Sequence, residues 1–266
     1  MTLSTHAIPH NITDVIGLPI DNVTLDDAAE QVIGTQRKFN INDNSSTRPS
    51  VYYFVNANSV NTCCKKPELT EVLMKADSLF ADGIGMRIAA KKCGSELIDN
   101  VNGTDLLPKL CERAAKSGKR IFLFGAKPGV AEKAAKNLTK SHKGLKIAGT
   151  HHGFVSEDKM PSLIAKINKS KADILLVAMG TPIQEFWVEK YASSLDCQAV
   201  MAVGGLFDFF SGAIPRAPLI MRKYGLEWVF RLIQEPVTKF ERYVLGVPEF
   251  LYHVYLENKR FSGVRP

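Results

Sequence analysis

The sequence predicts an α/β fold of the Rossmann-like type, a mostly parallel sheet with helices on both faces and a helical appendage at the C-terminal end. Short apolar segments alternate with segments of helical character from residue 51 to residue 203. The apolar segments are continuous, which is typical of parallel strands that are buried on both faces. We therefore expect a Rossmann-like domain over residues 1–212 and an appendage over residues 213–266.

The segment before the sheet contains few expected elements. We expect a loosely held polar stretch over residues 1–12 and a short strand over residues 15–20. Thr24, with Asp27 three residues later, predicts a capped helix start. The Asn/Ser-rich stretch 39–49 predicts a loop.

The repeating part of the chain supplies the expected sheet and its covering helices. The predicted strands cover residues 51–55, 78–81, 120–124, 145–148, 173–178 and 198–203. The predicted helices cover residues 67–76, 84–93, 104–118, 128–140, 157–168 and 184–194. In such a sheet, ligands bind outside the carboxyl ends of the strands. Those ends are rich in Gly, Asn, Asp and Thr: Asn56-Ala-Asn58, Asp82-Gly83, Gly125 to Gly129, Gly180-Thr-Pro182 and Gly204-Gly205.

Composition narrows the class of protein. The net charge of +7 favours anionic partners such as nucleotide diphosphates, nucleic acid or acidic lipid headgroups, without choosing among them. The five cysteines contain no CxxC spacing, which argues against a disulfide framework and a structural zinc site. The sequence shows no signal-peptide pattern and no apolar run of about 18 residues, so any membrane contact is expected to be peripheral.

No standard nucleotide-binding fingerprint occurs, because GxGxxG after a strand and GxxxxGK[ST] are both missing. The candidate phosphate-binding segment is the loop that starts at Gly125, since it follows a strand and opens a helix. An ordinary connecting loop is an equally good interpretation. His151 and His152 are adjacent and have no acidic or histidine neighbours in sequence, so no metal site is expected.

Several polar residues at the strand ends are candidates for chemistry. Asp82 has the position of a general base for a sugar hydroxyl, and helix capping is its alternative role. Thr104 or Asp105, after Asn102, is expected to cap the next helix. Gln184 and Glu185 open a helix, where they either bind sugar hydroxyls or a uracil edge or belong to a solvated first turn.

The C-terminal stretch is aromatic, basic and amphipathic. From Arg216 onward it has nine Lys/Arg and five Asp/Glu, and Leu226, Val229, Phe230 and Ile233 share one helix face. Two interpretations carry equal weight: a surface for membrane or acceptor binding, and an ordinary helical layer on the core. Arginines such as Arg231 and Arg242 are suited to hold a diphosphate.

An ordered set of segments resembles the WecG/TagA/CpsF family of bacterial glycosyltransferases (glycosyltransferase family 26). The resemblance covers about residues 15 to 245. Its segments are Asn56-Ala-Asn58, Ala81 to Gly85, Val101 to Leu106, Phe122 to Ala126, Gly180 to Glu185, Val203 to Phe209, Arg216-Ala-Pro218 and Gly225 to Leu232.

The resemblance implies an inverting, metal-independent transfer from a UDP-sugar to a polyprenyl-diphosphate-linked saccharide, with no cofactor. The transferred unit would be a hexose, an N-acetylhexosamine or its uronic acid, and the first candidates are N-acetylmannosamine and glucose. Such products serve cell-surface polysaccharide or teichoic-acid synthesis. The location implied is cytoplasmic, peripheral to the inner face of the plasma membrane, with the appendage completing the active site and contacting the membrane; self-association is an alternative use of its apolar face.

Carried onto this chain, the resemblance makes Asp82 the catalytic base and places Asn58 and Gln184 near the sugar. The substrate-binding set expected from pattern and resemblance together is Asn56, Asn58, Gly83, Gly85, Asn102, Thr104, Asp105, Gly125, Gly180, Gln184, Glu185, Arg216, Arg231 and Arg242.

The chain departs from the family pattern in three places. Asn56 stands where many members have Thr, and Asn100 where many have Arg. Around Pro236, Lys239 and Arg242 remain where many members carry more arginines. The diphosphate contacts are therefore expected to be redistributed.

Two rival classes are a non-catalytic nucleotide- or nucleic-acid-binding α/β protein and a Rossmann dehydrogenase. No recognised nucleic-acid module occurs, so no nucleic-acid partner is expected. The missing glycine fingerprint argues against the dehydrogenase.

Overall fold

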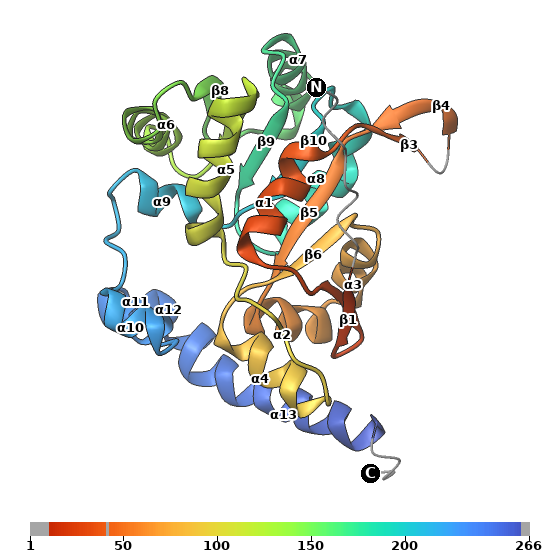
Figure 1. Cartoon of the computed structure of the whole chain (residues 1–266), viewed down its shortest axis with the longest axis vertical. Coiled ribbons are helices and arrows are strands. Elements are labelled where there is room, and N and C mark those ends of the chain that lie inside the picture. The colour runs from red at the N-terminus through yellow and green to blue at the C-terminus, as the bar shows by residue number, and fades with distance from the viewer. Residues whose placement is uncertain (1–10, 41–42, 262–266) are drawn as a thin grey trace, which may run out of the picture.

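A six-stranded parallel sheet forms the centre of the molecule (Figure 1). The structure is a computed structural model, and it describes residues 11–40 and 43–261. The strand order is β6-β5-β10-β9-β7-β8, and every neighbouring pair is parallel. The predicted fold class is confirmed. The strands are β5 (Ser50–Val55), β6 (Ser78–Ala81), β7 (Arg120–Gly125), β8 (Lys146–His151), β9 (Ile174–Ala178) and β10 (Ala199–Ala202).

The inner strands β9 and β10 are apolar because both faces of the sheet are buried there, whereas the edge strand β8 has no buried residue. In β7, Phe122 and Phe124 join the core on one face, whereas Ile121 and Leu123 join the core on the other. Successive side chains of a strand point to opposite faces, so each continuous apolar run supplies two cores.

Helices cover both faces. One core includes side chains from α1 (Leu25–Gly34), α5 (Gly103–Ser117), α6 (Val130–Ser141) and α9 (Leu206–Phe210). The other includes side chains from α2 (Ala57–Lys65), α3 (Pro67–Met74), α4 (Ile84–Lys92), α7 (Met160–Lys169) and α8 (Ile183–Tyr191). Two short 3-10 turns, η1 (Glu157–Lys159) and η2 (Ala192–Ser194), precede α7 and follow α8.

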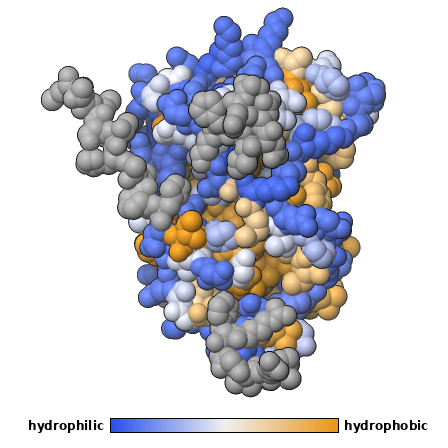
Figure 2. Space-filling model, turned by 90° about the vertical axis from the view of Figure 1, so that its right-hand side faces the viewer, coloured by the Kyte–Doolittle hydropathy of each residue, from blue (hydrophilic) through white to orange (hydrophobic). Residues whose placement is uncertain are grey.

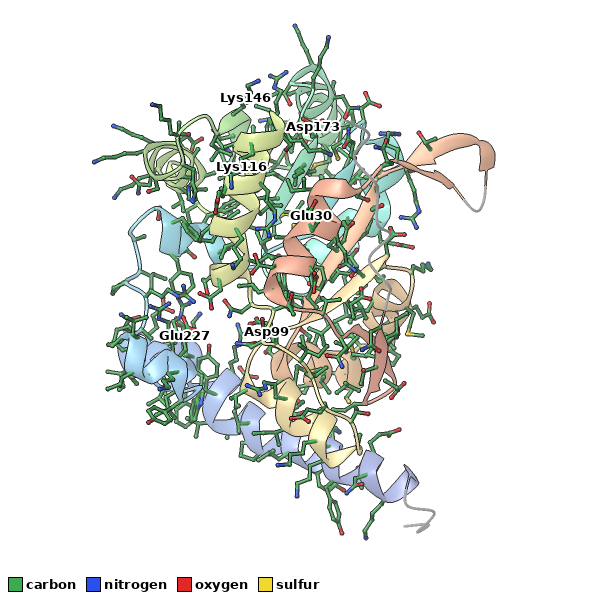
Figure 3. All side chains as sticks on the ribbon, in the orientation of Figure 1. Glu30, Asp99, Lys116, Lys146, Asp173 and Glu227 are labelled. Carbon is green, nitrogen blue, oxygen red and sulfur yellow. The ribbon has the colours of Figure 1, made fainter. Side chains whose placement is uncertain are left out.

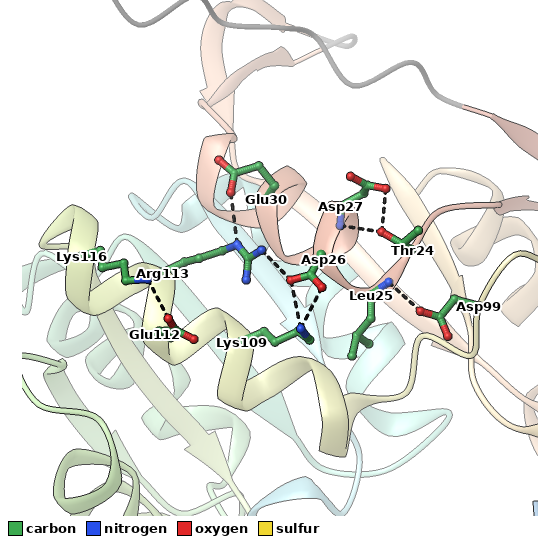
Figure 4. A network of polar contacts seen from close by, with 10 residues as sticks. All are labelled: Thr24, Leu25, Asp26, Asp27, Glu30, Asp99, Lys109, Glu112, Arg113 and Lys116. Atoms are coloured by element: carbon green, nitrogen blue, oxygen red, sulfur yellow. Dashed lines mark hydrogen bonds and ion pairs between the residues drawn. The ribbon is translucent and has the colours of Figure 1, made fainter. Parts of the chain in front are cut away.

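Charged side chains join α1 to α5 (Figure 4). Arg113 contacts Asp26 at 2.8 Å and Glu30 at 3.2 Å, and Lys109 contacts Asp26 at 2.8 Å. Hydrogen bonds from Lys109 and Arg113 lower the pKa of the Asp26 carboxyl group. Exposed pairs of this kind add little stability, so the contact between α1 and α5 depends mainly on the apolar side chains that both helices place in one core.

The N-terminal segment differs from the prediction in three ways. The single strand expected over residues 15–20 is a hairpin of β1 (Ile12–Val15) and β2 (Leu18–Asp21), because Ile16 and Gly17 turn the chain with positive φ. The loop expected over residues 39–49 contains an antiparallel pair, β3 (Lys38–Asn40) and β4 (Asp43–Arg48). Helix α2 was not predicted. The expected polar stretch 1–12 lies, up to residue 10, outside the described residues, as do residues 41–42.

The C-terminal stretch consists of five helices in two different settings. The first four, which we call the bridging helices, contain no buried residue: α10 (Leu219–Lys223), α11 (Glu227–Gln234), α12 (Pro236–Phe240) and the π-helix η3 (Glu241–Leu245). The fifth, α13 (Gly246–Phe261), packs along α2 and α4, and its Phe250 and Val254 belong to the main core. The domain boundary near residue 213 stays a prediction.

Apolar side chains also reach the surface. On the face shown in Figure 2, hydrophobic residues gather in the middle and lower parts, whereas the upper edge is mainly hydrophilic. The bridging helices expose Leu219, Ile220, Ile233, Val237 and Phe240. In the part of the chain that the structure describes, no helix has the length and apolar character needed to cross a membrane.

Candidate active site

The predicted base lies at the carboxyl edge of the sheet, where β6 ends. Asp82 directly follows β6, and its backbone N–H donates to the carbonyl of Val55 at the end of β5. The side-chain nitrogen of Asn56 (Nδ2) donates to Asp82 Oδ2 at 3.3 Å. The side-chain oxygen of Asn56 (Oδ1) caps α2 by accepting from the backbone N–H groups of Asn58 and Ser59. Asn56 therefore orients Asp82 from a fixed helix start.

Burial dominates the electrostatics of Asp82. Its side chain is partly buried, and the loss of solvation raises the pKa of its carboxyl group. The hydrogen bond from Asn56 and the charge of Arg242 act in the opposite direction, while the charges of Glu227 and Asp105 raise the pKa further. Asp82 thus lies within the field of charged groups from α5, α11 and η3.

Two glycines follow Asp82, and each has a separate structural reason. Gly83 has φ +95°, which favours glycine, and its N–H donates to Asn100 Oδ1 at 2.6 Å. A Cβ at Gly85 would lie 3.3 Å from the ring of Phe250 and 3.4 Å from Ala57. Asn100, which departs from the family pattern, therefore binds the backbone beside Asp82.

The start of α5 is capped by Asn102, not by Thr104 or Asp105 as predicted. Asn102 Oδ1 accepts from the Asp105 N–H at 2.9 Å and from the Thr104 hydroxyl at 2.7 Å. An Asn at this position satisfies free N–H groups of the first turn. The Asn102 side-chain nitrogen also donates to Asp105 Oδ2 at 2.7 Å, so the other carboxylate oxygen, Oδ1, is the one that contacts the arginines described next.

Ion pairs tie the bridging helices to α5. Arg216 Nη2 lies 2.7 Å from Asp105 Oδ1, and Arg222 Nη1 lies 3.8 Å from the same oxygen. Glu227 contacts Arg216 at 3.6 Å, and Figure 3 shows Glu227 at the edge of the bridging helices that faces the rest of the molecule. The structure thus brings together the predicted residues Thr104, Asp105 and Arg216, since Arg216 also donates to the Thr104 carbonyl.

A second group of basic residues lies around Asp208 of α9 and includes Arg231 of α11, Lys239 of α12 and Lys127 after β7. Arg231 stacks on the ring of Phe209 with 4.7 Å between guanidinium carbon and ring centroid, and it contacts Glu235 at 3.4 Å. Burial raises the pKa of Asp208, while the positive charges of Arg231, Lys239 and Lys127 lower it. Sequence reasoning missed Lys127, Asp208 and Arg222, although Asp208 lies in one of the segments that carry the family resemblance.

Gln184 and Glu185 lie beneath the strand-end loops. Gln184 is 3% exposed and Glu185 is 1% exposed. The side-chain oxygen of Gln184 (Oε1) accepts from the backbone N–H groups of Gly180 (3.2 Å) and Gly204 (2.9 Å). Gly180 is thereby joined to the loop that follows β10.

Gly125 is required where β7 meets β9. A Cβ there would lie 2.2 Å from the carbonyl oxygen of Ala178, and the next residue, Ala126, donates to that oxygen at 2.7 Å. Ala126 also accepts from Gly153, so the loops after β7, β8 and β9 pack together. The chain leaves β7 and β9 in opposite directions along the sheet, which makes this the switch point where open α/β sheets bind ligands.

A cavity of about 500 Å³ opens beside these loops, after β8. Among the described residues, its lining contains none of the predicted site residues. It is lined by His151, His152, Phe154, Val155, Ser156, Lys159, Ser162, Leu163 and Lys166. The ring of Phe154 is 70% exposed. Across residues 11–40 and 43–261, no three His, Cys, Asp or Glu side chains form a group suited to a metal ion.

Comparison with known proteins identifies the relatives of this chain. A family model described as "Glycosyl transferase WecG/TagA/CpsF family" matches residues 13–263. A protein of Bacillus spizizenii named N-acetylglucosaminyldiphosphoundecaprenol N-acetyl-beta-D-mannosaminyltransferase is 33% identical over 199 residues, which cover 75% of this chain and 76% of that protein.

Proposed function

The chain belongs to the WecG/TagA/CpsF family and is a glycosyltransferase, and from that premise we propose that Asp82 is the catalytic base of an inverting transfer. The donor is a UDP-sugar, and the acceptor is a hydroxyl of a polyprenyl-diphosphate-linked saccharide. The observation that carries the proposal is the position of Asp82, at a strand end and facing arginine-bearing helices. The rival class of non-catalytic binding proteins has no comparable support.

The name of the Bacillus spizizenii relative narrows the substrates. That protein is named for N-acetylmannosamine transfer to N-acetylglucosaminyl-diphospho-undecaprenol. We propose the same donor class here, an N-acetylmannosaminyl unit, with glucose or a uronic acid as alternatives. The identity of 33% leaves room for a different sugar, because pocket shape decides among related sugars.

The reaction is a single displacement at the anomeric carbon. The acceptor oxygen attacks that carbon while its proton passes to a carboxylate oxygen of Asp82. The bond from the anomeric carbon to the diphosphate oxygen breaks, and its electron pair leaves with UDP. A pKa raised by burial makes Asp82 a stronger proton acceptor, while Asn56 and Arg242 favour its ionised form.

Negative charge grows on the leaving diphosphate, so cations there favour the transition state. Arg231 and Arg242 are the proposed ligands, with Lys239 and Lys127 nearby. Nη1 of Arg231 is buried and has no hydrogen-bond partner among the described residues, so its N–H groups are unsatisfied and would gain a partner if a local movement admitted a phosphate oxygen. The cationic groups present suit a transfer that uses no metal ion or cofactor.

The nucleotide fits the switch point between β7 and β9. The loops that start at Gly125 and Gly180 meet there, and the adjoining cavity has the size of a ligand pocket. The exposed ring of Phe154 offers a surface on which a base can stack. Asn58, Gly83, Gly85 and the Asn102–Asp105 turn would then surround the sugar and the acceptor.

The bridging helices are the proposed contact with the cytoplasmic face of the membrane. Exposed Leu219 and Ile220 share α10 with exposed Lys223, and apolar side chains next to a basic residue suit the surface of an anionic bilayer. A lipid-linked acceptor would thereby reach Asp82 without leaving the bilayer. Self-association through the same apolar surface is the competing use.

The test is UDP release by the purified protein with a panel of UDP-sugars, with and without a short polyprenyl-diphosphate-linked saccharide, in EDTA. Acceptor-dependent release with one donor supports the proposal and identifies the sugar. Release that requires added divalent metal would contradict the metal-free mechanism. Failure of every UDP-sugar to bind would contradict the donor class.

A further inference from the structure

We infer that Glu185 is a positioning residue that acts through Gln184 to fix the distance between the loops after β9 and β10. The inference rests on the proposed function, because those two loops border the proposed donor site. It changes the expected role of both residues from contact with substrate to support of the backbone that faces it.

Both side chains are buried. Glu185 is 1% exposed and Gln184 is 3% exposed, so neither side chain offers its polar atoms to solvent or to a bound sugar. A buried carboxyl group is costly unless hydrogen bonds compensate for the lost solvation. Burial raises the pKa of Glu185, which agrees with a role that needs no negative charge.

The hydrogen bonds form one continuous chain. Glu185 Oε1 accepts from the Thr181 hydroxyl and from the Gln184 side-chain nitrogen, each at 2.9 Å. These bonds fix the orientation of the Gln184 amide, because exchanging its nitrogen and oxygen would break the bond to Glu185. Gln184 Oε1 is then directed at two backbone donors.

Those donors belong to different strand ends. Gly180 follows β9 and Gly204 follows β10, and both have positive φ, +81° and +59°. Neighbouring parallel strands hold their own spacing, but the loops beyond their ends have no ladder of hydrogen bonds. The side-chain oxygen of Gln184 accepts from both loops and so connects them, and Glu185 determines where that oxygen lies.

The arrangement yields a test by exchange of the two side chains. Glu185→Gln keeps an oxygen that accepts from Thr181 and Gln184, so kcat/KM should stay within about twofold of the wild-type value. Gln184→Glu places two carboxyl groups in contact and should lower kcat/KM about tenfold or more. The double variant Gln184→Glu/Glu185→Gln restores a donor between the two residues and should recover most of the loss.

Two readouts separate this inference from the proposed function. Amide hydrogen exchange at Gly180 and Gly204 should accelerate in Gln184→Glu and return toward the wild-type rate in the double variant, whether or not a UDP-sugar is turned over. The pH dependence of activity should be the same in Glu185→Gln and wild type, since the charge of Glu185 is not used.

A loss of activity in Glu185→Gln with unchanged exchange at both glycines would overturn the inference, because the charge would then matter and the position would not. Unchanged exchange and activity in Gln184→Glu would overturn it as well. If the wild-type protein transfers no sugar but exchange responds as expected, the proposed function fails and the positioning role of Glu185 stands.

Discussion

The carboxyl edge of the sheet and the bridging helices face each other, but they are held by different forces. Asp82 follows a strand whose residues are all buried, and its neighbours are fixed by backbone hydrogen bonds and an Asn cap. The bridging helices bury no residue, and ion pairs at Asp105 tie them to α5. The base therefore follows a buried strand, whereas Arg216 and Arg222 depend on charge contacts that salt screens.

Helix α13 shows how this difference arises along the chain. Phe250 is 1% exposed and packs in the main core, so the chain after the bridging helices is anchored by apolar burial. The bridging helices thus span two anchored points, α9 and α13. We infer that the bridging helices can move without loss of the fold, which would suit the lipid-linked acceptor proposed above.

Removing the anchor should produce the largest change in stability. Phe250→Ala deletes a ring from the core, and we expect the free energy of unfolding to fall by about 3–5 kcal/mol. Val237→Ser, at a site 90% exposed on a bridging helix, should change it by less than about 0.5 kcal/mol. Urea unfolding of both variants checks the comparison, and equal losses would contradict the division into anchored and bridging parts.

Weakening the ion pairs should affect substrate binding more than stability. Asp105→Asn removes the charge that holds Arg216 and Arg222, and we expect the KM for the UDP-sugar to rise by about three- to tenfold. The free energy of unfolding should fall by about 1 kcal/mol at most, because these pairs are partly exposed. If 0.5 M salt raises the KM of the wild-type protein but not that of Asp105→Asn, the ion pairs are the salt-sensitive contact; equal salt effects would argue against it.

The smallest expected effect is a displacement of the pH profile. Asn56→Ser keeps a residue that caps α2 but is too short to donate to Asp82. Because the Asn56 bond favours the ionised carboxylate, its loss should raise the pKa of Asp82. Activity that needs the ionised form is lost as pH falls through that pKa, so the acid limb of kcat/KM should move to higher pH. A displacement to lower pH, or no displacement, would show that Asn56 does not stabilise the ionised carboxylate of Asp82.

The sequence predicted the sheet well because most of its parallel strands are continuous apolar runs with a helix after them. It failed where polar residues form strands: the stretch Asp43–Arg48 contains no apolar residue, yet it pairs with β3. Helix α2 escaped notice because its Asn, Ser and Thr residues are weak helix formers and its start depends on the Asn56 cap.

The site could be predicted only as far as strand ends indicate it. Pattern and resemblance together selected Asp82 and Arg216, and the structure places both among charged groups at the carboxyl edge. The burial of Gln184 and Glu185 could not be read from sequence, because a polar pair in a first helical turn is ordinarily solvated. Likewise, Lys127 and Asp208 are far apart in sequence, and the order of the strands brings the charge of Lys127 close enough to act on Asp208.

If Asp82 accepts the proton of the acceptor hydroxyl, acceptor-dependent UDP release should depend on its carboxylate, and the Asp82→Asn variant provides the test. The matched control is Asp196→Asn, which changes an exposed carboxylate just before β10, at the opposite edge of the sheet. We predict a fall in turnover of about a thousandfold for Asp82→Asn, with UDP-sugar binding intact and the control unchanged. Wild-type turnover in Asp82→Asn would contradict this role of Asp82.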